Sequence, residues 1–313
     1  MSLSPPAAPR KRHFLARRAQ VAHWRMSRLD PAAQALLWSM SAGLLFVVLN
    51  SIMRGLSMVL DPFQTQFLRY LLGLGVMLPL VLRSGMAAYR PRNIGGQFIR
   101  GAVHTAGLCL WFIAVPHITL ADTTAIGFTG PIFIMLGAVL VFKEPMRWER
   151  WLAAAIGFGG VLIVVGPKMS GSGGIYNLVM LASAPVFAAS FLITKALTRY
   201  ERPEVIVVWQ SITVTLFSLP LALLHWQMPG PWQWVLFLLC GILGSAGHYC
   251  LTRSYAAADI SATQSVKFLD LVWATLIGWL AFGDMPSNST LVGGVVICAA
   301  TIWIARRESR SPR

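Results

Sequence analysis

ISATQSVKFLDLVWATLIGWLAFGD, residues 260–284, is the stretch that decides the fold class of this chain. A helix rises ~1.5 Å per residue, so a helix of this length reaches across a hydrocarbon core of ~30 Å. Lys267 and Asp270 stand near its middle, three residues apart and therefore on one helix face. An ionisable residue at bilayer depth costs at least ~2.5 kcal/mol, so it normally faces a partner or a polar cavity. We therefore expect other helices to surround this one.

The composition agrees with a membrane protein. Of the 313 residues, 56% are hydrophobic and only 12% are charged, whereas a soluble domain has about 25% charged residues. Apolar runs of near-spanning length recur along the chain, which is typical of a polytopic α-helical membrane protein. A transmembrane barrel would need sustained alternation of apolar and polar residues, and none is present.

The apolar runs predict an all-α membrane protein with ten transmembrane helices. We expect them at residues 35–57, 62–82, 97–118, 119–142, 149–167, 176–197, 204–226, 232–252, 260–283 and 289–305. The connections between them are short, and several contain Pro or Gly. The predicted organisation is a basic cytoplasmic tail (1–33), a first five-helix repeat (34–167), a linker (168–175), a second five-helix repeat (176–305) and a cytoplasmic tail (306–313).

The two halves repeat at an offset of 140–141 residues. This offset pairs Pro62 with Pro203, Leu78-Pro79-Leu80 with Leu219-Pro220-Leu221, and Glu144 with Asp284. Each half has five crossings, an odd number, so the second half must enter the membrane upside down relative to the first. Inverted repeats of this kind are the structural basis of alternating access, with the ligand site near the bilayer midplane.

The ends of the two halves resemble those of a known family. Phe142-Lys143-Glu144-Pro145 and Phe282-Gly283-Asp284-Met285-Pro286 look like the end of the EamA unit of the drug/metabolite transporter superfamily, and Gly130-Pro131 fits its fourth crossing. The resemblance covers about residues 35–305. It implies ten helices, a central cavity and transport of small organic solutes across an inner or plasma membrane. Leu271 stands where the first half has Pro131, which leaves a proline-dependent bend in doubt there.

The charge distribution predicts orientation and partners. The net charge is +15, and with a cytoplasmic N-terminus the inner segments hold 22 of the 26 basic residues. This bias predicts that both termini lie in the cytoplasm, and it argues against a nucleic-acid-binding protein. Together with the membrane that the family resemblance implies, we expect a multi-pass protein of the cell inner membrane. The basic segment 1–33 suits a cytoplasmic tail, a helix lying on anionic lipid or a targeting segment, and these alternatives stay open.

Lys267 and Asp270 lead the candidate binding residues. They would line the cavity, bind a zwitterionic or carboxylate substrate or exchange a proton, or else form a permanent structural ion pair. Trp273 lies three residues beyond Asp270 and would add an aromatic wall for a flat ligand, although packing explains most membrane tryptophans. Gln264 is a further polar residue in the same crossing.

Other in-span polar and aromatic residues complete the candidate set. Arg69 suits a substrate carboxylate or phosphate, or snorkels to headgroups, and the repeat offset places Gln210 opposite it. The remaining candidates for the pocket are His104, His248, Trp111 and Asn50.

Several function classes lack their motifs. No HExxH metal motif, phosphate-binding loop or zinc spacing of cysteines is present, so we expect no cofactor, metal or catalytic residue and do not expect an enzyme. The competing class, an integral-membrane enzyme, would need convergent catalytic groups at one depth.

The sequence predicts a secondary transporter of a small organic metabolite, an amino acid or related compound, working by alternating access. The alternative is an importer of a vitamin or cofactor-like solute such as riboflavin or S-adenosylmethionine. The expected partners are the substrate and membrane lipids, with proton coupling and homodimer formation left open.

Overall fold

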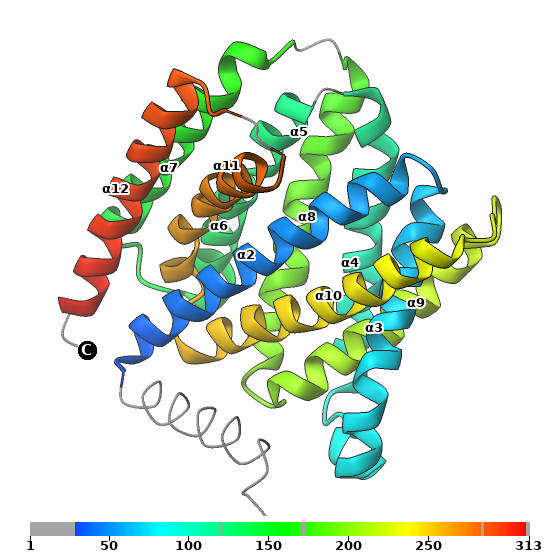
Figure 1. Cartoon of the computed structure of the whole chain (residues 1–313). Coiled ribbons are helices and arrows are strands. Elements are labelled where there is room, and N and C mark those ends of the chain that lie inside the picture. Colours follow the sequence, from blue (N-terminus) through cyan, green and yellow to red (C-terminus); the bar gives the residue numbers. More distant parts are fainter. Residues whose placement is uncertain (1–28, 119, 171–172, 283–284, 311–313) are drawn as a thin grey trace, which may run out of the picture.

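The computed structural model describes residues 29–118, 120–170, 173–282 and 285–310, and every regular element within these ranges is a helix (Figure 1). The first half contains α2 (Pro31–Ser57), α3 (Pro62–Ser84), η1 (Met86–Tyr89), α4 (Ile94–Ala114), η2 (Val115–His117), α5 (Leu120–Gly127), α6 (Gly130–Phe142), α7 (Trp148–Val165) and η3 (Gly166–Lys168). The second half contains α8 (Ile175–Leu197), α9 (Pro203–Ala222), α10 (Pro231–Ala257), η4 (Ser261–Thr263), η5 (Ser265–Phe268), α11 (Leu269–Phe282) and α12 (Asn288–Arg310).

The prediction of an all-helical polytopic membrane protein is confirmed. Among the described residues, eight helical segments are long and apolar enough to cross a bilayer, and one of them, Thr123–Phe142, comprises most of α5 together with α6. The two other predicted crossings are α4, which contains the buried Arg100, and the interrupted segment from Ser261 to Phe282. The predicted span ends at 118 and 226 lie beyond α4 and α9, which end at Ala114 and Ala222.

Local sequence signals explain where several helices begin. The Asp61 side chain accepts hydrogen bonds from two backbone N–H groups in the first turn of α3, whose first residue is Pro62. The Asn93 side chain likewise accepts a hydrogen bond from the N–H of Gly96 in the first turn of α4. These side chains satisfy helix-end donors that have no partner within the helix, while proline lacks the N–H that would need one.

The expectation that residues 119–142 and 260–283 each form one continuous helix is wrong. The first crossing breaks between α5 and α6, at residues 128–129, and the second passes through η4 and η5 before α11 begins at Leu269. In the second, Thr263 Oγ1 and Gln264 Nε2 both donate to the carbonyl of Ile260. Side-chain bonds to nearby backbone compete with regular helix formation. Leu271 stands at the position of the second half that is equivalent to Pro131 in the first half. The second break therefore does not require a proline.

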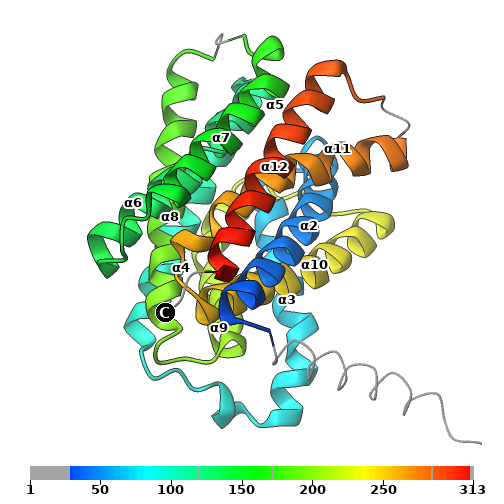
Figure 2. The same cartoon turned by 90° about the vertical axis from the view of Figure 1, so that its left-hand side faces the viewer.

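The two halves pack with the symmetry of an inverted repeat. The α2 helix packs along α10 and α8 packs along α4, so each half places its first helix against the third helix of the other (Figure 1). The pairs α3–α9 and α7–α12 join equivalent helices, and Figure 2 shows α7 and α12 side by side. The start of α2 and the end of α12 lie at the same end of the bundle in both views, which we call the terminal end.

Polar contacts at the terminal end join the two halves. The Glu144 carboxylate follows α6 and accepts from the backbone N–H groups of Ile260 (3.1 Å) and Ser261 (3.2 Å) at the start of the second interrupted crossing. Arg150 of α7 forms an ion pair with Asp259 at 3.3 Å. These contacts hold the two interrupted crossings together at this end.

Candidate functional site

A buried polar cluster lies between the two halves, where α3 and α4 meet α9 and α10. We call it the central cluster and define it as Arg69, Tyr70, His104, Gln210 and His248. Four of the five side chains are buried, and Arg69 is partly buried. Buried polar groups of this kind need partners, because no water in the bilayer core replaces their lost hydrogen bonds.

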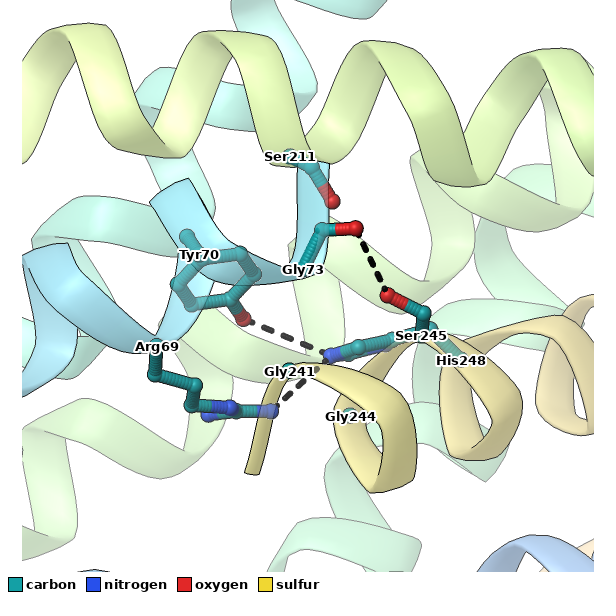
Figure 3. Close-up of a pocket in the computed structure, with 8 residues that line it drawn as sticks. All are labelled: Arg69, Tyr70, Gly73, Ser211, Gly241, Gly244, Ser245 and His248. Carbon is teal, nitrogen blue, oxygen red and sulfur yellow. Dashed lines mark hydrogen bonds between the residues drawn. The ribbon is translucent and has the colours of Figure 1, made fainter. Parts of the chain in front are cut away.

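The His248 side chain, in the second half, contacts residues of the first half. Its Nε2 atom lies 3.5 Å from Arg69 Nη2 and 3.3 Å from Gln210 Nε2. Both of these nitrogens only donate, so His248 Nε2 accepts and its ring is neutral with the proton on Nδ1. Figure 3 shows Arg69 and Tyr70 reaching this ring from α3.

Tyr70 extends the cluster to α4 and α8. Its hydroxyl lies 2.9 Å from His104 Nε2 and 3.3 Å from His248 Nε2, so it bridges the two imidazoles. The other nitrogen of His104 lies 3.2 Å from the Ser190 hydroxyl. Hydroxyl and neutral imidazole groups both donate and accept, so this chain of contacts can exchange partners with a bound solute.

Arg100 supports the central cluster through a hydrogen bond to Gln210. Its guanidinium donates to Gln210 Oε1 at 2.7 Å, to the Ile206 carbonyl at 3.2 Å and to the Thr194 hydroxyl. This arrangement fixes the Gln210 amide with its nitrogen toward His248. Arg100 is only 2% exposed, so its role here is to position Gln210 and to tie α4 to α8 and α9.

A small pocket opens beside the cluster between α3 and α10. Its cavity has a volume of about 10 Å³, room for about one water molecule, and is lined by Arg69, Tyr70, Gly73, Ser211, Gly241, Gly244, Ser245 and His248 (Figure 3). A Cβ atom at Gly241 would lie 2.7 Å from the Gly73 backbone nitrogen, so glycine lets the two helices approach here. Pockets for drug-sized ligands occupy about 300–1,000 Å³. The helices must therefore separate before an organic solute of that size can enter.

The charges in this region are mainly positive. None of the hydrogen bonds to the central cluster in the described part of the chain comes from Asp or Glu, and all three partners of Arg100 are neutral. The Arg69 Nε atom has no hydrogen-bond partner. Buried cations without counter-charges favour a ligand that supplies acceptors or negative charge.

Lys267 and the central cluster share a neighbour, the aromatic ring of Phe46. Its Nζ atom lies 5.5 Å from the centre of the Phe46 ring, and the same ring lies 5.0 Å from the His248 ring. Phe46 on α2 therefore lies close to both the ammonium group and the His248 ring of the central cluster. A cation over a ring face is attracted by the electron density of that face.

Asp270 occupies the first turn of α11 and faces α2. A Cβ atom added at Gly43 would overlap the Asp270 Oδ1 atom, which shows how closely the carboxylate meets α2. Within the described residues, no ion pair of 4 Å or less joins Asp270 to Lys267. A carboxylate in a first helical turn is stabilised by the dipole of its helix.

The other residues singled out from the sequence lie away from the central cluster. Trp273 packs in the hydrophobic cluster around α7 and α12, and its buried Nε1 atom has no hydrogen-bond partner. Gln264 is buried and bonds to Ile260 and Thr263. Trp111 is partly buried with its ring against Phe112, and Asn50 is exposed on α2.

Sequence reasoning missed Tyr70, Arg100 and Ser190. The 22 basic residues counted for the inner segments include Arg100, but α4 begins at Ile94 and buries it. Arg100 precedes His104 by four residues, so the two share a helix face, and this spacing is the signal that could have identified it. Among the described residues, no group of three His, Cys, Asp or Glu side chains is placed to hold a metal ion.

Comparison with known proteins adds named relatives. A riboflavin transporter of Rhizobium johnstonii is 35% identical over 285 residues, covering 90% of this chain and 94% of the relative. An S-adenosylmethionine uptake transporter of Rickettsia prowazekii is 26% identical, covering 80% of this chain and 85% of the relative. A pseudopaline exporter of Pseudomonas aeruginosa is 28% identical, covering 90% and 99%.

The fold and the family are shown by two further matches. A solved crystal structure matches with a TM-score of 0.77 over 89% of this chain and 99% of its own, and at 18% identity this likeness shows the fold alone. The model of the EamA-like transporter family matches twice, at residues 33–166 and 174–306. This chain belongs to the EamA-like transporter family.

Proposed function

We propose that this protein imports riboflavin, or a closely related flat and uncharged heteroaromatic compound, across the cell inner membrane. Support comes from riboflavin transporters among its relatives, which include proteins of Rhizobium johnstonii and Vibrio cholerae. The two halves would rock against each other and expose the central cluster to one side at a time. The basic residues near the terminal end favour a cytoplasmic location for both termini.

The observation that carries this proposal is the chemistry of the central cluster. Arg69 and Tyr70 present donors in the pocket, His248 also lines it, and the hydrogen bonds described there include no carboxylate. Riboflavin is uncharged and rich in carbonyl, ring-nitrogen and hydroxyl acceptors. Such a ligand would accept hydrogen bonds from the cluster, and its flat ring would fit beside Phe46, whose own ring already lies against His248.

The positive charge of the central cluster also determines how well the other candidate substrates would bind. S-Adenosylmethionine carries a sulfonium cation, which the nearby arginines would repel unless Asp270 balanced it. An amino acid was our main expectation from the sequence, but the vitamin alternative fits the named relatives better. The proposal makes this chain a carrier and not an enzyme.

Asp270 is our candidate for proton coupling. It is a partly buried acid in the interrupted crossing, beside α2 and near Lys267. Protonation would remove its charge, so that the two halves would enclose a neutral acid in place of a carboxylate during the transport cycle.

Uptake of riboflavin into proteoliposomes tests the proposal. We expect saturable uptake of chemically unchanged riboflavin, weak competition by S-adenosylmethionine and none by amino acids. Uptake of an amino acid with no movement of riboflavin would refute the cargo assignment, and chemical conversion without net movement would favour an enzyme.

A further inference from the structure

Two glutamines near the start of α3 are both buried but differ in their hydrogen bonding. Gln64 donates to the Gln227 carbonyl through Nε2 and accepts from the Gln227 N–H at 2.8 Å through Oε1. Gln66 is 1% exposed, and neither Nε2 nor Oε1 has a hydrogen-bond partner. Gln64 therefore joins the two halves, whereas the amide of Gln66 has no structural task that explains its burial.

Helix geometry directs Gln66 toward the central cluster. Residues three, four and seven positions apart share a helix face, which places Gln66 with Arg69, Tyr70 and Gly73. These three all line the small pocket against α10. The neighbouring Phe67 points instead into an apolar cluster. Gln66 thus extends the polar face of α3 by about one turn, ~5.4 Å, away from the terminal end.

A glutamine amide presents a donor and an acceptor next to each other. An imide edge, in which a ring N–H lies beside a ring carbonyl, presents the complementary pair. Leaving both groups of a buried amide unpaired is unfavourable, so a solute with that edge would gain two hydrogen bonds where the protein alone has none.

We infer that Gln66 contacts the cargo and recognises an imide or lactam edge of a flat heterocycle. This inference rests on the proposed function and deepens it, because the ring of riboflavin carries such an edge. The Arg69 guanidinium would then hold a different part of the same molecule, about one helical turn away.

The first measurement compares riboflavin with its N3-methyl derivative, in which the imide N–H is blocked. We expect the wild-type protein to transport riboflavin about tenfold faster at low concentration, as the loss of a hydrogen bond to a buried group predicts. Gln66→Leu should bring this ratio close to one without lowering the melting temperature. Gln64→Leu, the matched control, should lower the melting temperature and keep the wild-type ratio. A wild-type ratio in Gln66→Leu would overturn the inference.

A second measurement does not depend on the identity of the cargo. Gln66→Cys and Gln64→Cys are made in a chain whose four native cysteines are replaced, and both are exposed to a membrane-impermeant thiol reagent in proteoliposomes. We expect faster labelling at position 66, because this position lines the path that opens between the halves. Equal or slower labelling at 66 would overturn the inference. If wild-type protein moves no riboflavin, the proposed function fails, and this labelling alone decides whether Gln66 lies on the path.

Discussion

The fourth crossing of each half, residues 120–142 and 261–282, breaks at the same point of the repeat and carries different chemistry there. The first breaks before Gly130 and Pro131, and the second before Asp270 and Leu271, which are the positions 140 residues later. Discontinuous helices near the midplane are the usual place for binding sites in transporters built from inverted repeats. Both halves therefore share the break, and the second adds charged groups to it.

The difference shows that the break and the charge have separate causes. In the first half, glycine and proline suffice for an interruption without charge. In the second half, the side chains of Thr263 and Gln264 bond to nearby backbone, and Asp270 occupies the first turn of the resumed helix. The second crossing packs against α2, and through Lys267 and Phe46 it approaches the central cluster. Changes at the second break should therefore affect transport more than changes at the first.

The largest expected effect is that of Asp270→Asn. Removing the charge should lower flux at least about tenfold, or abolish its dependence on a proton gradient, because the substituted amide neither releases a proton nor carries the charge. The measurement is riboflavin uptake with and without a pH gradient. Asp259→Asn, at the terminal end, is the matched control and should keep the pH dependence. Unchanged flux and pH response in Asp270→Asn would leave that carboxylate a structural role only.

The next effect is steric. Gly43→Ala places a Cβ atom on the Asp270 Oδ1 atom, whereas Gly130→Ala meets nothing within 4 Å. Overpacking of this kind costs typically ~1–3 kcal/mol, so Gly43→Ala should lower both the melting temperature and the flux. Gly130→Ala should change neither by much. Equal behaviour of the two variants would show that the contact between Asp270 and α2 is unimportant.

A third prediction concerns the contact that joins the two interrupted crossings. Glu144→Gln should weaken the charged hydrogen bonds to the N–H groups of Ile260 and Ser261, which are worth ~1.5–3 kcal/mol each in typical proteins. The melting temperature in detergent should fall by several degrees. Glu149→Gln, in the first turn of α7, is the control and should change it less. Equal melting temperatures for wild type and Glu144→Gln would argue against this link.

The smallest effect is expected from Pro131→Leu, which gives the first break the residue found in the second. Because the second half breaks without proline, the first should keep its break, and the melting temperature should shift by no more than a few degrees. Flux within about twofold of wild type is expected, since a change below ~0.5 kcal/mol alters a rate by about that factor. A loss of transport would show that the two breaks are maintained in different ways.

The fold was largely predictable because it follows from the lengths of the apolar runs and from the repeat at an offset of about 140 residues. Hydrophobic runs do not reveal where a crossing is interrupted, so both breaks were missed even though Gly130 and Pro131 were recognised. In the second crossing, the break depends on side-chain bonds such as Thr263 to Ile260, which only local geometry reveals.

The central cluster was only partly predictable. The in-span residues Arg69, His104, Gln210 and His248 were selected because polar groups within spans are rare, and the structure brings these four together. Arg100 was hidden because it stands close to a helix end, where basic residues usually mark orientation. Tyr70 and Gln66 look like ordinary residues of an amphipathic segment, and their role depends on which face meets α10.

Thermal stability of the purified protein with riboflavin and with S-adenosylmethionine is the most direct test of a pocket rich in donors and free of carboxylates. A ligand at 100 times its dissociation constant stabilises the folded state by ~2.7 kcal/mol. We predict that riboflavin raises the melting temperature, that Arg69→Leu reduces this rise, and that S-adenosylmethionine raises the melting temperature much less than riboflavin does. Stabilisation by the sulfonium compound and none by riboflavin would contradict the account.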